Sequence, residues 1–234
     1  MSNVWNLLVD GKFIEACNEA DVEYKNTGSE FPLRNKVFAL LNLEKYEETS
    51  NLCKKIIELR NGETDSDFIF LGVARWLLGR HQEAIDAWNA SCKCKYTDAA
   101  GGVDVPLLLY SASISLRSLD LRNESLRQLK KIVKHPEISN WPGPLAQYIL
   151  GTIKEEQLFK SVSAQTSLRV RQLCQVNYYM GMVMLMDGNK SYFLSRMKEA
   201  CSQHGVAILI PEFYLARANC GDTVSQPAPD GKAK

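Results

Sequence analysis

The sequence predicts an all-α protein made of paired helices, and three observations carry this prediction. Apolar residues recur at the spacing of one helix face through most of residues 2–201. A short turn pattern precedes several of these stretches, in which a glycine or an acidic residue is followed by a basic residue and a ring-bearing one. The small residues Ala16, Thr49 and Ala84 are separated by 33 and 35 residues, which is the period of a helical-hairpin repeat.

The clearest helical hairpin lies at residues 68–91. Within its first helix, Gly72 follows large apolar residues and allows a neighbouring helix to approach closely. Gly79 ends that helix, and the chain then turns and starts a second one. The inward face of the second helix is expected at Ala84, Trp88 and Ser91. A single hairpin cannot bury its own apolar face, so this unit predicts neighbours of the same kind.

Two similar hairpins precede it. The first has Trp5 on its first helix and a turn at residues 11–16. The second runs from about Phe31 to Glu58 and has its turn at residues 44–49. Because each turn occupies the same place between its two helices, we expect the three hairpins to stack in register.

Beyond Ser91 the connection lengthens, and Gly101, Gly102 and Pro106 mark it as a loop. Ser125 then takes the place of Ala84, 41 residues later, which is one repeat plus the insertion. The helices expected after the loop are 107–117, 123–134 and 145–153, a degenerate helix within 155–168, the pair 173–186 and 190–201, and a capping helix at 211–219. We expect residues 1–220 to form one domain and the polar residues 221–234 to be a disordered tail.

The residues Phe68, Leu71 and Gly72, followed by Ala84 and Trp88, stand at the spacing of a known signature. This pattern resembles the tetratricopeptide repeat, although an arginine stands where that family usually has an aromatic residue. The resemblance covers about residues 2–201. It implies a right-handed superhelical stack of about five to six helix-turn-helix pairs, closed by a C-terminal capping helix.

Composition excludes several classes of function. With 28 basic and 27 acidic residues, the chain has no overall field that would draw it to nucleic acid or to an anionic membrane. The first residues do not resemble a secretory signal, and no apolar run approaches the roughly 18 residues of a membrane span. Seven cysteines, an odd number, fit free thiols in a reducing compartment. We therefore expect a cytoplasmic protein that binds neither nucleic acid nor membranes.

No sequence pattern points to catalysis, to a cofactor or to a metal. Phosphate-binding, nucleophile-elbow and zinc-protease signatures do not occur. Zinc needs four converging ligands, whereas Cys92 with Cys94, and Cys201 with His204, are isolated pairs. A hydrolase with a site between helices would depend on unpatterned carboxylates such as Glu155. We expect a protein that is not an enzyme.

The resemblance also implies a binding surface. In the tetratricopeptide repeat family the first helices of successive hairpins line a concave groove. An exposed apolar and aromatic face of this kind would bind a protein or a peptide. Carried onto this chain, the groove is lined by Trp5, Phe38, Leu41, Ile69, Val73, Trp76, Tyr110 and Ile114, with Arg34, Asn35 and Arg117 at its edges. The alternative is that residues 155–168 or the C-terminal helix fill the groove from within.

A narrower resemblance concerns the partner. The loop 96–103, the corner 140–144 and the ending 213–217 resemble small bacterial repeat proteins that act as immunity proteins beside polymorphic or contact-dependent toxins. That resemblance implies a toxin domain as the partner and inhibition by covering its active site. The alternative is an adaptor that reads short peptides. The sequence leaves open the partner's identity, the face that is used and the oligomeric state.

A basic stripe is expected on the second helix of the fourth hairpin. The segment 115–135 carries six positive and two negative charges, and the recurring basic residues are Arg127, Lys130, Lys131 and Lys134. We interpret the stripe as a solvated outer face, with a charged partner surface as the alternative.

Overall fold

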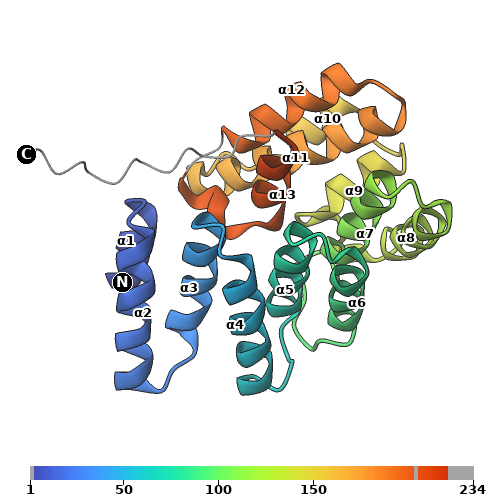
Figure 1. The fold of residues 1–234 in the computed structure, drawn as a ribbon. Coiled ribbons are helices and arrows are strands. Elements are labelled where there is room, and N and C mark those ends of the chain that lie inside the picture. The colour runs from blue at the N-terminus through green and yellow to red at the C-terminus, as the bar shows by residue number, and fades with distance from the viewer. Residues whose placement is uncertain (1–2, 203–204, 221–234) are drawn as a thin grey trace, which may run out of the picture.

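The computed structural model describes residues 3–202 and 205–220, and every regular element within them is a helix. Thirteen α-helices and two short 3-10 helices follow one another in these ranges, and an isolated bridge joins Thr64 to Tyr96. Consecutive helices pack against each other (Figure 1). The all-α prediction is confirmed for the described residues, while the tail predicted at 221–234 lies outside them. No described helix is long and apolar enough to cross a membrane.

The first three hairpins form where the sequence predicts them. Gly11 and Gly79 reverse the chain with left-handed backbones, φ 73° and 75°, and Glu44 takes φ 58° at the same place in the middle hairpin. A left-handed residue ends a helix and turns the chain within a short connection. The pairs are α1 (Asn3–Val9) with α2 (Phe13–Thr27), α3 (Phe31–Asn42) with α4 (Tyr46–Leu59), and α5 (Asp65–Leu77) with α6 (His81–Ser91).

The small residues used to align the hairpins face inward. Ala16, Thr49, Ala84 and Ser125 are each 0% exposed. A larger side chain at these points would hold paired helices apart, so the repeated small residue is a packing requirement. The prediction that these four positions are inward points of successive hairpins is confirmed.

Both helices of the fourth hairpin begin earlier than predicted. Helix α7 (Asp104–Ser115) starts before the loop was expected to end, so Pro106 lies in its first turn. Proline fits there because the first amides of a helix have no partner within the helix. Helix α8 (Leu119–Ile132) starts where Ser118 accepts a hydrogen bond from the Leu121 amide and caps the helix.

The predicted boundaries are wrong between residues 136 and 172. Helix α9 (Gly143–Ile149) stops before residue 153 because Gly151 takes a left-handed backbone, φ 71°. The degenerate helix expected through residue 168 is only α10 (Glu155–Lys160), and α11 (Thr166–Met186) starts seven residues before residue 173. The other elements are η1 (Pro136–Ser139), α12 (Lys190–Cys201), η2 (Gly205–Leu209) and α13 (Pro211–Cys220).

Two glycines, Gly72 and Gly181, bring paired helices into close contact, and the sequence predicts this role for Gly72. A Cβ on Gly72 would lie 2.2 Å from the indole nitrogen of Trp88 on the paired helix. That indole nitrogen donates a hydrogen bond to the Ile69 carbonyl, with an N–O distance of 3.1 Å. A Cβ on Gly181 would lie 2.6 Å from the terminal methyl of Met197. In both pairs the missing side chain is what allows the second helix to lie so near.

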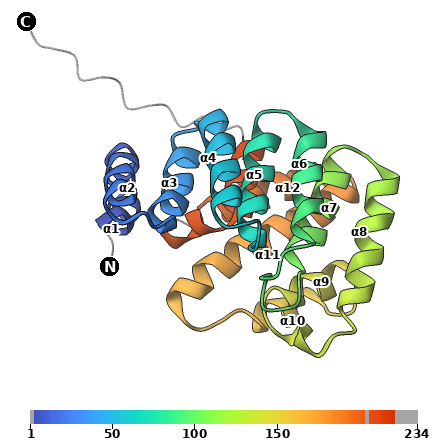
Figure 2. The same cartoon turned by 90° about the horizontal axis from the view of Figure 1, so that it is seen from below.

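The C-terminal helix packs across the first helices of the hairpins. Helix α13 lies against α5 and α11, above the row formed by α3, α5 and α7 (Figures 1 and 2). The hydroxyl of Tyr214 accepts a hydrogen bond from the Asn42 side chain at 3.1 Å and donates one to the Ile208 carbonyl at 2.7 Å. The Arg217 guanidinium donates to the Leu41 carbonyl at 2.8 Å. The C-terminal helix therefore occupies part of the groove, which is one of the two alternatives that the sequence leaves open.

Candidate functional site

The residues predicted to line the groove do not form one open surface. Leu41, Ile69, Val73 and Tyr110 are buried in the core. Their prediction as partner contacts has to be corrected for this conformation, because α13 and α11 pack over the wall that they form. A buried side chain contributes to stability and cannot touch a partner unless the covering helix moves.

Trp5 and Trp76 are half-buried and pack against the core. The Trp76 ring lies 5.7 Å from the ring of Trp88 and 4.4 Å from that of His81, measured between centroids. These aromatic contacts tie the third hairpin together across its turn. Trp76 therefore has a structural role within its own hairpin.

Three other predicted residues, Arg34, Asn35 and Phe38, lie together at an open hollow of about 330 Å³. We call it the Phe31 hollow. Its walls come from α3, α4 and α5, and Leu209 at the end of η2 closes one side. Its residues are Phe31, Arg34, Asn35, Val37, Phe38, Cys53, Ile56, Ser66, Asp67, Phe70 and Leu209.

Aromatic rings form much of the Phe31 hollow. Phe38 and Phe70 meet edge to face with their ring centroids 5.1 Å apart. Phe31 stands at the hollow with 65% of its surface exposed, more than any other large apolar side chain described. Exposing an apolar ring to water is unfavourable, so burying Phe31 against an apolar group of a partner would contribute to binding.

The charges at the Phe31 hollow are matched within the protein. Arg34 Nε lies 3.0 Å from a carboxylate oxygen of Asp67, and Arg60 Nε lies 3.7 Å from the other oxygen. Burial raises the pKa of Asp67, although the two arginines oppose the rise. The side chain of Asn35, within α3, makes no hydrogen bond to another described residue, so its amide is available to a partner.

The two remaining predicted residues, Ile114 and Arg117, lie at a second hollow of about 450 Å³, between α7, α8 and the end of α11. We call it the Arg117 hollow. Its residues are Ser113, Ile114, Ser115, Arg117, Ser118, Leu119, Arg122, Leu185 and Met186. The structure thus divides the predicted groove into two hollows and a covered wall.

Sequence reasoning missed several residues of these hollows. Phe31 served only to mark the start of the second hairpin, although it lines the first hollow and is 65% exposed. The repeat held a signal for Phe31, since Ser66 lies 35 residues later and lines the same hollow. No comparable signal brings Met186 next to Arg117, because that contact depends on how α11 packs against α7.

Of the three segments behind the narrower resemblance, the loop and the corner are in contact, and hydrogen bonds through Gln175 connect the corner to Glu212, which directly precedes the ending. The Asn140 amide donates to the Ala99 carbonyl at 3.2 Å, which joins the corner to the loop. The Trp141 indole donates to Gln175 Oε1 at 2.6 Å, and Gln175 donates to the carboxyl group of Glu212 at 3.2 Å. This chain of hydrogen bonds connects the corner through α11 to α13 and holds the C-terminal helix in place.

Buried carboxyl groups lie in the same region. Burial raises the pKa of Glu212, and hydrogen bonds from the Tyr179 hydroxyl, at 2.8 Å, and from Gln175 only partly oppose that rise. The pKa of Asp104 is also raised, first by burial and then by the charges of Asp98 and Glu212. Asp98 accepts hydrogen bonds from the amides of Ala100, Gly102 and Asp104, which shapes the loop before α7.

Every described cysteine with a shifted pKa has that pKa raised, so none of these thiols is activated as a nucleophile. Burial raises the pKa of Cys94 to about 11, and it also raises the pKa values of Cys17 and Cys92. A thiol with a raised pKa stays protonated near neutral pH and reacts poorly.

In residues 3–202 and 205–220, no three metal-binding side chains gather in one place. No protein-family model matches the chain, and no curated protein matches its sequence.

Proposed function

We propose that the chain is a non-enzymatic interaction module that binds a segment of another protein in the Phe31 hollow. One observation carries the proposal: Phe31 is 65% exposed beside a hollow built from the rings of Phe38 and Phe70. Aromatic anchors at a concave, mostly apolar site are where binding energy concentrates in protein interfaces. The unpaired amide of Asn35 adds a polar contact that can fix the orientation of the bound segment.

The proposal includes the repeat architecture. We infer a right-handed, tetratricopeptide-like stack from the equal burial of Ala16, Thr49, Ala84 and Ser125 and from the successive pairing of the helices. In its narrower form the partner is a bacterial toxin domain, and this rests on the resemblance of the three segments alone. We also propose the cytoplasm as the place of action, with no nucleic acid or membrane as the partner.

The test compares binding by two aspartate variants. Phe31→Asp places a charge at the hollow and should weaken binding about thirtyfold or more, which corresponds to the roughly 2 kcal/mol of an interface anchor. The matched control is Ile14→Asp, because Ile14 is 63% exposed on α2 and is not one of the residues that line the hollow. The wild type and both variants would serve as baits, and each captured protein would be purified and titrated by calorimetry.

The outcomes separate the alternatives. A single stoichiometric partner with nanomolar affinity, lost only in the Phe31 variant, supports an immunity protein if that partner is a toxin. Several partners with micromolar affinity support a peptide-reading adaptor. Equal affinity in all three baits contradicts the proposed site, and substrate turnover by the isolated chain would return the hydrolase to consideration.

A further inference from the structure

The Arg117 hollow holds two arginines without a counter-charge. Arg34, Arg75 and Arg80 each form an ion pair with an acidic residue. The side chains of Arg117 and Arg122, in contrast, form no ion pair or hydrogen bond with another residue in the described part of the chain, although their backbones are hydrogen-bonded. Both side chains line one hollow of about 450 Å³. Two guanidinium groups at one concavity create a positive potential that favours an anionic ligand.

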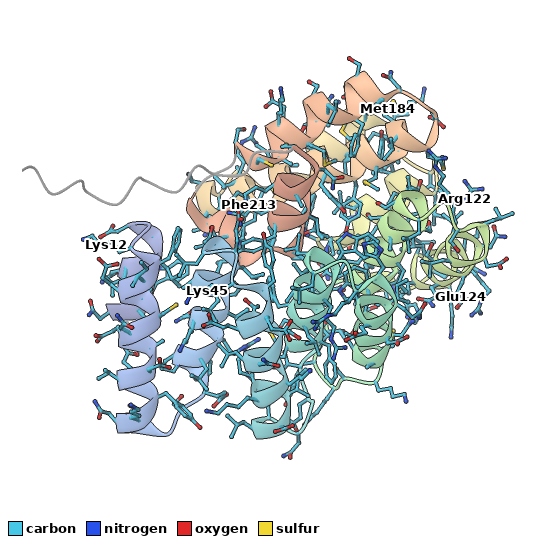
Figure 3. The ribbon with its side chains drawn as sticks, in the orientation of Figure 1. Lys12, Lys45, Arg122, Glu124, Met184 and Phe213 are labelled. Atoms are coloured by element: carbon cyan, nitrogen blue, oxygen red, sulfur yellow. The ribbon has the colours of Figure 1, made fainter. Side chains whose placement is uncertain are left out.

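The acidic residues in this part of the sequence are Asp120 and Glu124 on α8 and Asp187 directly after α11, and none of these three forms an ion pair with Arg117 or Arg122. Of the two acidic residues on α8, Glu124 is already taken by Arg127, at 2.6 Å. That ion pair and a hydrogen bond from Gln128 lower the pKa of Glu124 to about 2, so the pair persists across the physiological range. Arg122 lies on α8 at the edge of the molecule, well away from Phe213 on α13 (Figure 3). An approaching acidic group therefore meets the two free arginines without hindrance from α13.

The apolar residues that line the hollow are aliphatic, and three serines and the two arginines complete the lining. Leu119 is 57% exposed and Met186 is 42% exposed, and Ile114 also contributes to the lining. None of the residues that line the hollow is aromatic. Nucleic acid bound to a basic surface usually stacks its bases on aromatic rings, which this lining does not offer. Aliphatic side chains beside arginines suit a protein segment that carries both carboxylates and apolar groups.

Arg117 stands where most hairpins of this chain have a glycine. Its backbone is left-handed, φ 53°, as are Gly11, Gly79 and Gly188 in the corresponding turns. Glu44 is the other residue with a side chain at this position, φ 58°. A glycine would adopt this left-handed conformation without strain. The arginine therefore places a side chain at this turn at the cost of backbone strain.

We propose that the Arg117 hollow binds an acidic segment of a partner protein. Carboxylates of that segment pair with the guanidinium groups of Arg117 and Arg122, and its leucine or isoleucine side chains pack on Leu119 and Met186. The inference rests on the proposed function and extends it, because it gives the chemistry of a second contact made by the same partner.

A defined probe tests the inference without knowledge of the partner. The probe is a fluorescein-labelled peptide in which pairs of glutamates alternate with leucines, and its binding to the full chain is followed by fluorescence anisotropy. The test variant combines Arg117→Gly with Arg122→Gln. Because Arg117→Gly relaxes a left-handed backbone, the variant is not expected to lose its fold. The matched control is Glu44→Gly, which relaxes the same turn position in another hairpin.

We expect the double variant to bind the peptide at least tenfold more weakly than the wild type and the Glu44 variant. Binding should weaken as salt is added, and a peptide with glutamine in place of glutamate should not bind. Methyl NMR gives the location: the Met186 signal should shift on titration, while the signal of Met197, which is 0% exposed, should not.

Three results would overturn the inference. These are absence of peptide binding to the wild type, equal binding by the double variant, and tighter binding at Met186 of a single-stranded oligonucleotide of the same charge. If the Phe31 variant loses its partner while the peptide fails to bind, only the second contact is refuted. If the peptide binds as expected while the Phe31 variant keeps its partner, only the proposed Phe31 site is refuted.

Discussion

Asp65, the first residue of α5, is a buried acid whose nearest charged neighbours are also acids. Burial and the charges of Asp98 and Asp67 together raise its pKa to about 6, against hydrogen bonds from the Ser66 and Asp98 amides that partly oppose the rise. The carboxyl group is therefore more easily protonated in the folded chain than in the unfolded one. A raised folded pKa means that the stability contributed by the protonated group is complete below about pH 4 and is lost as pH rises through about 6.

Removing the charge of Asp65 should therefore increase the free energy of unfolding, and the size of the increase should depend on pH. Each pKa unit is worth about 1.4 kcal/mol, so Asp65→Asn should raise the free energy of unfolding by about 1 to 3 kcal/mol above pH 7. At pH 4 the folded Asp65 is almost fully protonated, so the difference should fall below about 1 kcal/mol. Urea unfolding at the two pH values measures it. An equal effect at both would show that the charge of Asp65 is not the cause.

Packing between paired helices provides the prediction at the scale of the element. Gly72→Ala places a methyl group against the indole of Trp88, which is fully buried and hydrogen-bonded to the Ile69 carbonyl. The indole cannot move aside freely, so we expect a loss of about 1 to 3 kcal/mol in the free energy of unfolding.

The matched control for this prediction is Gly181→Ala, also inside a helix, where the nearest atom is the flexible end of Met197. Alanine improves helix propensity by about 1 kcal/mol at both positions, so the difference between the variants isolates the packing cost. We expect Gly181→Ala to lie within about 1 kcal/mol of the wild type. Equal losses in urea unfolding would contradict the account given for Gly72.

Most elements could be predicted from the sequence because their signals are local. The turns at Gly11, Glu44, Gly79 and Gly188 are set by residues adjacent in the chain. A helix begins two residues after each of them, namely α2, α4, α6 and α12 in the same order. The region 136–172 could not be predicted in the same way. The helix predicted at 145–153 includes Gly151, but this glycine has a left-handed backbone and ends the helix.

At the scale of the whole molecule, the helix α13 links the two ends of the chain. Tyr214→Phe removes the hydrogen bonds with Asn42 and Ile208, and leaves the buried Ile208 carbonyl without that donor. We expect a cost of about 1 to 3 kcal/mol, with faster amide hydrogen exchange in α3 and α5 and unchanged exchange in α8.

Tyr96→Phe is the control for this exchange experiment, because Tyr96 is 51% exposed and its hydroxyl forms no hydrogen bond within the described residues. If exchange increases equally in α8, or does not change in α3 and α5, then α13 does not hold the first helices as inferred. Mass spectrometry of peptic fragments resolves these helices separately.

The division of the groove could be stated from the sequence only as an alternative. Leu41 and Val73 are apolar, as residues of either a binding surface or a core would be. Periodicity shows which helix face they share but not what covers that face. What decides is a contact between residues far apart in the chain, such as Arg217 with Leu41. Arg34, Asn35 and Phe38 line one hollow because they share one face of a single helix, while their role as partner contacts stays a prediction.

The contact between Arg217 and Leu41 spans 176 positions of the chain, and this has a consequence during protein synthesis. Helices α3 and α5 emerge from the ribosome long before the residues of α13 have been translated. Their apolar walls at Leu41, Ile69 and Val73 then stay uncovered, in the state that invites aggregation and chaperone binding. A nonsense mutation at the start of α13, which removes that helix and the residues after it, should therefore yield a polypeptide that is degraded in the cell, even though every hairpin before it is intact.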